Sequence, residues 1–169
     1  RVIPGFTDYN KRIQKPGGFY LPNGARERNF KTDSGKAKFS VIDIPEHRES
    51  ADEFAMMTIR SHDQYNTTIY GLNDRYRGIQ NERRVILMNE EDMKEHDLQK
   101  LEVVNLSSAY NGVTRRVEKF LVVPYPIPKR NVATYFPEAN PLVPIDSFAK
   151  KSQTPVSKRV LIKIEKTNA

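Results

Sequence analysis

Short apolar runs separated by turn-forming residues fill the chain after residue 53, a pattern typical of β-strands. The runs expected to form strands are "FAMMTIR" (54–60), "RRVILMN" (83–89), "KLEVVNLSS" (100–108), "TRRVEKFLVV" (114–123), the weaker "NVATYFP" (131–137) and "SKRVLIKIE" (157–165). Asn111 and Gly112 lie between the third and fourth runs and are a strong hairpin signal. Because long amphipathic helices are missing, we predict a mainly β, compact barrel rather than an open parallel α/β sheet.

One or two short helices are expected beside these strands. The stretch "NEEDMKEHD" (89–97) begins with Asn89, a good N-cap, and continues with acidic residues where the helix dipole favours negative charge. A short helix is therefore predicted directly after the second strand.

The first 53 residues have a different pattern of apolar and polar residues. They contain the turn clusters "PGGFYLPNG" (16–24) and "TDSGK" (32–36) and little apolar periodicity. Only "KFSVIDIP" (38–45) could form a short strand there. We therefore predict a loop-rich flank at 1–53, derived from a preceding domain, and a β domain at 54–169.

Composition narrows the possible functions. The chain has 169 residues, no cysteine and a net charge of +7 from 28 basic and 21 acidic residues, which indicates either an anionic partner or a well-solvated surface. The lack of cysteine excludes disulfides, iron–sulfur ligation and thiolate catalysis within the chain. No apolar run approaches the roughly 18 residues of a membrane span, and no secretion signal is visible, so we expect a cytoplasmic protein. Because the chain starts at Arg1, we expect a piece of a longer polypeptide.

Catalytic signatures are not found in the sequence. His47, His62 and His96 are scattered and fit no metal-binding spacing. Ser61, His62 and Asp63 are adjacent in sequence and cannot normally reach the mutual geometry of a catalytic triad. Glycine patterns of phosphate-binding loops are missing as well.

A long polar loop follows the first predicted strand. Arg60 stands where the strand ends, and its guanidinium could pair with phosphate or carboxylate. The side chains that follow supply hydrogen-bonding groups and flat rings suited to a polar, planar ligand: Ser61, Asp63, Gln64, Tyr65, Asn66 and Thr67. A polar loop that merely caps the barrel explains the same composition. A second such region near the C-terminus contains Asn140 and Lys158, and loops at one barrel end can converge.

Four motifs in the correct order give a resemblance to a known family. They are "TDSGKAKF" (32–39), "MMTIRSHDQYNTT" (56–68), "MNEEDMKEHDLQKLEVVNLSS" (88–108) and "EANPLVPIDSFAKKSQTPVSKRVLIKIE" (138–165). Together they resemble the C-terminal cofactor-binding domain of the molybdopterin oxidoreductases, the dimethyl sulfoxide reductase superfamily. The stretches 3–24 and 66–79 are similar to the formate-dehydrogenase-like alpha-subunit branch.

The resemblance implies a double-psi β-barrel that contacts bis(molybdopterin guanine dinucleotide) carrying molybdenum or tungsten. Upstream domains of the same polypeptide would supply the metal ligand, because this chain has no cysteine. The implied cofactor contacts are Arg60, Ser61, Asp63, Gln64, Tyr65, Asn66, Thr67, Asn140 and Lys158. No catalytic or metal-binding residue is implied within the chain, which we expect to be inactive by itself.

The sequence departs from the family pattern at two places. Asp97 and Leu101 replace the glycines after the predicted helix, and a leucine does not easily take a left-handed backbone, so we expect a different turn there. Val143 and Pro144 alter the segment after Asn140, where fine contacts should differ.

A rival interpretation is a free-standing basic β-barrel module that binds nucleic acid or protein without a cofactor. Nucleic-acid binding would require basic residues and exposed aromatic rings gathered on one face. The arginines and lysines are instead spread over several predicted elements, so nucleic acid is the weaker interpretation.

Overall fold

The computed structural model describes residues 5–44, 46 and 50–167. The chain divides into two compact units, residues 1–46 and residues 47–169, which are considered separately. His47 lies outside the described residues.

The first unit is loop-rich. Its one described helix, α1 (Tyr9–Arg12), belongs to a small aromatic cluster with Phe6 and Phe19. The Arg12 guanidinium lies 3.9 Å from the centre of the Phe19 ring and donates a 2.6 Å hydrogen bond to the Gly5 carbonyl. The strand expected at 38–45 is wrong for residues 38–44, which are extended and unpaired; Pro45 lies outside the described residues. A strand needs a partner, and the described chain offers none to this segment.

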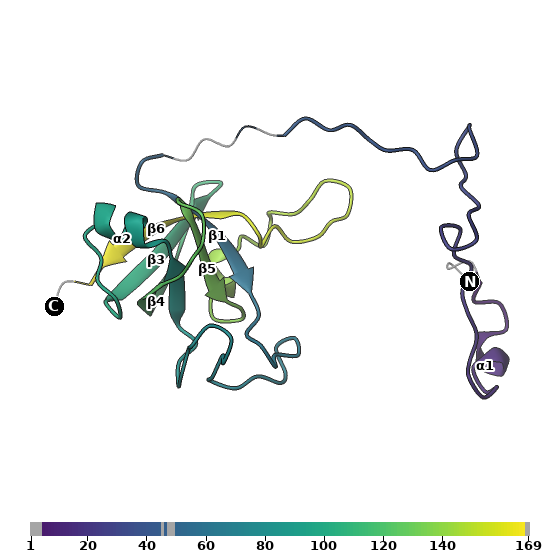
Figure 1. Ribbon diagram of the computed structural model, residues 1–169, viewed down its shortest axis with the longest axis horizontal. Helices are drawn as coiled ribbons and strands as arrows, with labels where there is room; N and C mark the ends of the chain where they lie inside the picture. The colour runs from purple at the N-terminus through teal and green to yellow at the C-terminus, as the bar shows by residue number, and fades with distance from the viewer. Residues whose placement is uncertain (1–4, 45, 47–49, 168–169) are drawn as a thin grey trace. The chain divides into compact units, whose positions relative to one another are not determined.

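The second unit is a closed barrel of six strands in the order β1-β5-β2-β4-β3-β6 (Figure 1). The strands are β1 (Phe54–Ile59), β2 (Val85–Met88), β3 (Val103–Tyr110), β4 (Val113–Pro124), β5 (Asn131–Tyr135) and β6 (Val160–Lys166). β1 runs parallel to β5, and β2 runs parallel to β4; the other neighbours are antiparallel. This mainly β barrel with short helices confirms the predicted fold class.

Alternating side chains build two apolar clusters, one inside the barrel and one outside it. Phe54 and Met56 of β1 point into the main core together with Ile86 and Met88 of β2. All four residues of β2 are buried, since its neighbours cover both faces. Val85 and Leu87 therefore join a second cluster, which contains Ala133, Tyr135 and Ile79. Ile79 belongs to the long connection between β1 and β2, so this connection covers the outer face of the sheet.

The predicted helix and hairpin are both confirmed. Helix α2 spans Glu90–Glu95, and the Asn89 side chain accepts a 2.8 Å hydrogen bond from the Glu91 amide, as an N-cap should. Asn111 and Gly112 connect β3 to β4 with φ values of 48° and 76°, which a tight hairpin turn requires. A single-turn 3-10 helix, η1 (Asn140–Leu142), follows β5.

The turn after α2 corrects one expectation. Asp97 and Leu101 both adopt a left-handed backbone, with φ of 51° and 64°, so the leucine takes the conformation that it was expected to avoid. The Leu101 amide donates a 2.8 Å hydrogen bond to the Val122 carbonyl, and the Lys166 ammonium pairs with the Asp97 carboxylate at 2.8 Å. These tertiary contacts hold a conformation that an isolated leucine avoids.

Replacing Leu101 by glycine should therefore stabilise the chain. Glycine relieves a backbone cost of about 1–2 kcal/mol and loses about 0.5–1 kcal/mol through greater freedom in the unfolded state. The Leu101 side chain is 56% exposed, so little packing is lost. We expect Leu101→Gly to raise the free energy of unfolding in urea by about 0.5–1 kcal/mol. The adjacent Lys100→Gly should lower it, and an equal loss in both variants would contradict the strain argument.

Candidate functional site

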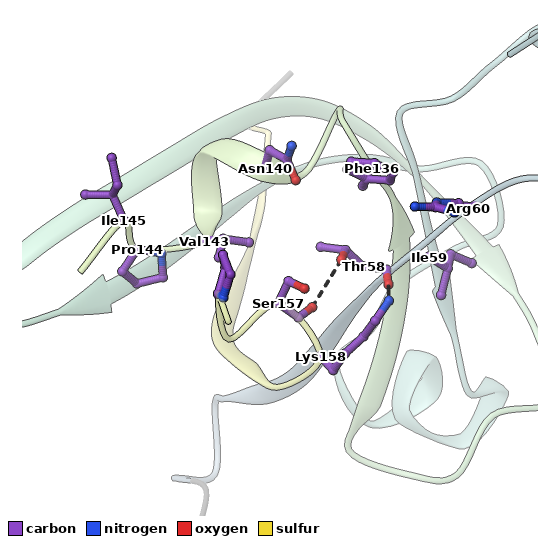
Figure 2. Close-up of a pocket in the computed structure, with 11 residues that line it drawn as sticks. Thr58, Ile59, Arg60, Phe136, Asn140, Val143, Pro144, Ile145, Ser157 and Lys158 are labelled. Carbon is purple, nitrogen blue, oxygen red and sulfur yellow. Dashed lines mark hydrogen bonds between the residues drawn. The ribbon is translucent and has the colours of Figure 1, made fainter. Parts of the chain in front are cut away.

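A pocket of about 810 Å³ lies at the end of the barrel where β1 and β5 finish and β6 begins (Figure 2). Ile59 pairs with Tyr135 across the parallel β1 and β5, and Met56 pairs with Val160 across the antiparallel β1 and β6. Residues that follow β1 and β5 must therefore meet residues that precede β6. The pocket is lined by Thr58, Ile59, Arg60, Phe136, Asn140, Val143, Pro144, Ile145, Pro155, Ser157 and Lys158.

Three residues that the sequence nominated for a ligand site line this pocket together. They are Arg60, Asn140 and Lys158, which come from three different segments of the chain. The Lys158 ammonium donates a hydrogen bond to the Thr58 carbonyl, which fixes it beside β1. None of the described residues that line the pocket is acidic. The site is therefore cationic.

Arg60 is oriented by its neighbours. Its guanidinium donates a 2.7 Å hydrogen bond to the Asn66 side-chain oxygen and lies 5.6 Å from the centre of the Phe136 ring. Both neighbours leave further guanidinium N–H groups for an external acceptor, since the group has five donors. Ile59, Val143 and Pro144 also line the pocket and form its apolar wall. Such a combination suits a ligand with both an anionic part and a flat ring.

A buried arginine organises the polar loop from within. Arg83 is 3% exposed, and its guanidinium donates to the Ser61 hydroxyl at 2.8 Å and to the Gln64 side-chain oxygen at 2.9 Å. It also donates to the Phe136 carbonyl at 3.0 Å and to the Glu138 carboxylate at 2.7 Å. The start of the loop, the end of β5 and the approach to η1 are thereby joined at one group.

The Arg83 guanidinium is also enclosed by rings. It lies 4.3 Å from the centre of the Tyr70 ring and 4.9 Å from that of Tyr135. Gln64 adds to the same network, because its side-chain nitrogen donates to the Phe136 carbonyl at 2.8 Å. Ser61 and Gln64 consequently use their side chains on the protein itself.

The remaining nominated residues lie at the loop surface. Asp63 contacts His62 at 3.3 Å and Arg75 at 3.6 Å, and Tyr65 is 69% exposed. Thr67 is exposed, and Asn66 holds Arg60. The structure thus brings Arg60, Asn140 and Lys158 into one pocket and leaves Ser61, Asp63, Gln64, Tyr65, Asn66 and Thr67 in the loop beside it.

A second buried group anchors the distal part of the loop. The Asp74 carboxylate, in a residue 1% exposed, accepts hydrogen bonds from the Tyr135 hydroxyl at 2.7 Å and from the Arg77 guanidinium at 2.5 Å. Burial alone would raise the pKa of Asp74, but these bonds outweigh it and hold the pKa below its ordinary value. Burial and the neighbouring carboxylate raise the pKa of Tyr135. Arg77 also donates to the Arg60 carbonyl at 3.3 Å, so this anchor reaches the pocket.

Sequence reasoning missed the groups that position the site. In the sequence, Arg83 is one of many dispersed basic residues, and nothing assigns a role to Asp74 or Phe136. "RRVILMN" places Arg83 near a fully apolar strand, which is a weak signal that its side chain is buried. Asp74 followed by Tyr76 and Arg77 is a recognisable turn pattern, since its carboxylate accepts from both of their amides, at 3.1 and 3.3 Å.

Two further negative findings apply to the parts that the structure describes. No helix among residues 5–44, 46 and 50–167 is long and apolar enough to cross a membrane. Within the same ranges, no group of three or more histidine, aspartate or glutamate side chains is placed to hold a metal ion.

Comparison with known proteins gives one family and several relatives. The family described as "Molydopterin dinucleotide binding domain" matches residues 54–161. A protein named as an uncharacterized oxidoreductase in Mycobacterium tuberculosis is 44% identical over 172 residues, covering 98% of this chain and 22% of the relative. Protein YdeP of Escherichia coli is 40% identical over 174 residues, covering 99% of this chain and 23% of the relative. The chain thus spans less than a quarter of the length of these curated relatives.

Removing Arg83 should destabilise the chain strongly. Arg83→Ala leaves the Glu138 carboxylate, whose side chain is 16% exposed, without its cationic partner. Breaking a buried pair in this way costs about 3–5 kcal/mol, which urea unfolding followed by circular dichroism would measure. The matched control is the neighbouring, exposed Arg84→Ala, with an expected change within about 0.5 kcal/mol. Equal effects of the two variants would show that Arg83 does not organise the loop.

Asp74 should make part of the stability depend on pH. Because the pKa of Asp74 is lower in the folded state, its contribution to the free energy of unfolding is present above the unfolded-state pKa of about 3.8 and is lost as pH falls through the folded pKa. Asp74→Asn should lower the free energy of unfolding by about 1–3 kcal/mol at pH 7, and the difference from the unmodified chain should shrink as the pH falls below about 5. The surface variant Asp63→Asn is the control. A gap that stays constant with pH would contradict this role.

Proposed function

Because the chain belongs to the family of molybdopterin dinucleotide binding domains, we propose that the pocket beside Arg60, Asn140 and Lys158 binds the dinucleotide cofactor of an oxidoreductase. The observation that carries this proposal is the convergence of two cations and an amide on one pocket without an acidic side chain. The relatives that are named as oxidoreductases support the proposal that the domain belongs to an oxidoreductase.

The chemistry of the donors fits such a cofactor. Arg60 and Lys158 can offset the charge of a diphosphate, and Arg60 can do so through two parallel N–H groups. The Asn140 side chain carries a donor and an acceptor, which is what the edge of a pterin or guanine ring requires. Phe136 and the apolar wall offer surface for the flat parts of the ligand.

We also propose which dinucleotide cofactor is bound and which kind of oxidoreductase carries the domain. The four ordered motifs support bis(molybdopterin guanine dinucleotide) with molybdenum or tungsten, and the stretches 3–24 and 66–79 support a formate-dehydrogenase-like enzyme. When bound, the metal–pterin group would supply the redox chemistry. The residues of this chain would hold the dinucleotide and orient it, while a metal ligand would come from another part of the polypeptide.

The internal anchors would contribute by keeping the site rigid. Arg83 fixes the loop that carries Arg60, and Lys158 is fixed by the Thr58 carbonyl. A site whose groups are already held in place loses less conformational entropy when a ligand binds. Ser61 and Gln64 would therefore assist binding through Arg83, in addition to any contact that they make themselves.

Nucleic acid is a less favoured partner for this surface. Several exposed cations are paired with carboxylates: Arg75 with Asp63, Arg116 with Glu165, Lys129 with Glu95, Lys163 with Asp52 and Lys166 with Asp97. A nucleic-acid interface needs basic groups that are free to meet phosphates. This pairing supports a well-solvated surface as the reason for much of the basic excess.

Arg60→Ala and Lys158→Ala test the proposal in the full-length enzyme that carries this domain. Each removes a charge-assisted contact worth about 1.5–3 kcal/mol, so we expect roughly a tenfold or greater loss of cofactor affinity. Molybdenum or tungsten content and guanine nucleotide released by acid would be measured on purified protein. Thermal unfolding of the cofactor-free forms should change little.

Lys151→Ala provides the matched control, because Lys151 is exposed and does not line the pocket. It should leave metal and nucleotide content unchanged. Full cofactor content in both Arg60→Ala and Lys158→Ala would overturn the proposed site.

A further inference from the structure

The flank carries an apolar stretch that has no cover. In the extended segment, defined as residues 37–44, four large apolar side chains are almost fully exposed. Phe39 is 96% exposed, Val41 98%, Ile42 81% and Ile44 92%. Scattered single apolar residues on a surface are ordinary, but four within six positions are not.

The backbone of the extended segment is also unpaired. Among the described residues, no backbone hydrogen bond joins residues 37–44 to any other part of the chain. Figure 1 draws this stretch as an extended trace. The turn before it is ordered, since the Thr32 hydroxyl donates to the Lys36 carbonyl at 2.8 Å and the Gly35 amide donates to the Thr32 carbonyl at 2.9 Å. An ordered turn thus leads directly into an open strand-like backbone.

The side-chain pattern matches a strand that is buried on both faces. Alternate residues of an extended backbone point to opposite sides, so Phe39 and Val41 share one side while Ile42 and Ile44 share the other. Valine and isoleucine favour strands. Strands covered on both faces are rich in apolar residues on both, and each side of this segment carries two large apolar side chains, with Asp43 on the first side and Ser40 on the second.

The barrel of this chain is complete without the extended segment. Its six strands pair with one another in a closed order, in which each strand has a neighbour on either side. The relatives have room for a partner elsewhere in the polypeptide, because this chain spans only 22% and 23% of their length.

We propose that the extended segment adds as a strand to a sheet in the remainder of the full-length polypeptide. Backbone pairing would provide the attachment, and the two apolar faces would be covered by that sheet's own layers. Attachment within one polypeptide is favoured because the linked partner is present at high effective concentration. Lys36, just before the segment, and Lys38, near its start, favour an acidic neighbour there.

Hydrogen exchange measured by mass spectrometry tests this inference. In the 169-residue chain, the amides of residues 38–44 should exchange as fast as in an unstructured peptide. In the full-length polypeptide they should exchange at least 100-fold more slowly. Equally fast exchange in both proteins would overturn the proposal. Protection in the 169-residue chain that rises with protein concentration, together with a dimeric mass, would overturn it in favour of a second copy.

Variants on each face sharpen the test. Val41→Asp and Ile42→Asp in the full-length polypeptide should each restore fast exchange over residues 38–44 and open the segment to protease cleavage. Ser152→Asp, an exposed position in the barrel unit, is the control and should leave the segment protected. If the Asp variants are insoluble, the exchange comparison of the unmodified proteins decides alone. Cofactor content measured in the same samples separates failed docking from a failed assignment of the pocket.

Discussion

The arrangement of the candidate site depends on one buried guanidinium. The Arg83 guanidinium lies between two tyrosine rings. It donates hydrogen bonds to four groups at once: the Ser61 hydroxyl, the Gln64 side-chain oxygen, the Phe136 carbonyl and the Glu138 carboxylate. A planar group with five donors can join several segments in one fixed geometry, which an ammonium cannot do. Arg60 and Phe136 keep their places at the pocket because the segments that carry them are joined there.

Strand direction supplies the second constraint. The parallel pairing of β1 with β5 and the antiparallel pairing of β1 with β6 bring Arg60, Asn140 and Lys158 to one end of the barrel, although nearly one hundred residues separate the first from the last. A closed barrel fixes these directions for every strand. The pocket is thus a result of the topology, and its charge is a result of which residues stand at the strand ends.

The sequence allowed most of the barrel to be predicted, because the strands, α2 and the Asn111–Gly112 hairpin depend on local patterns. It also nominated three of the residues that line the pocket, Arg60, Asn140 and Lys158, through the family resemblance. It could not reveal Arg83 or Asp74 as anchors, since their partners Glu138 and Tyr135 are more than fifty residues away. Distant contacts also decide two features that local propensity misses. Leu101 is held left-handed by the Val122 carbonyl, and residues 38–44 find no partner strand among the described residues.

Ile79 shows that the long connection after β1 has two roles, one in the hydrophobic packing and one in the pocket. It is 6% exposed and packs with Val85, Leu87, Ala133 and Tyr135 against the outside of the sheet, while the same connection carries Arg60 at its other end. An ordinary surface loop can drift in sequence or be grafted from a relative without disturbing its scaffold. This one cannot be exchanged so freely, because an altered loop must reproduce a piece of the hydrophobic interior as well. Ligand preference in such a domain would therefore evolve by substitutions at the exposed positions of the loop, with its length and buried residues retained.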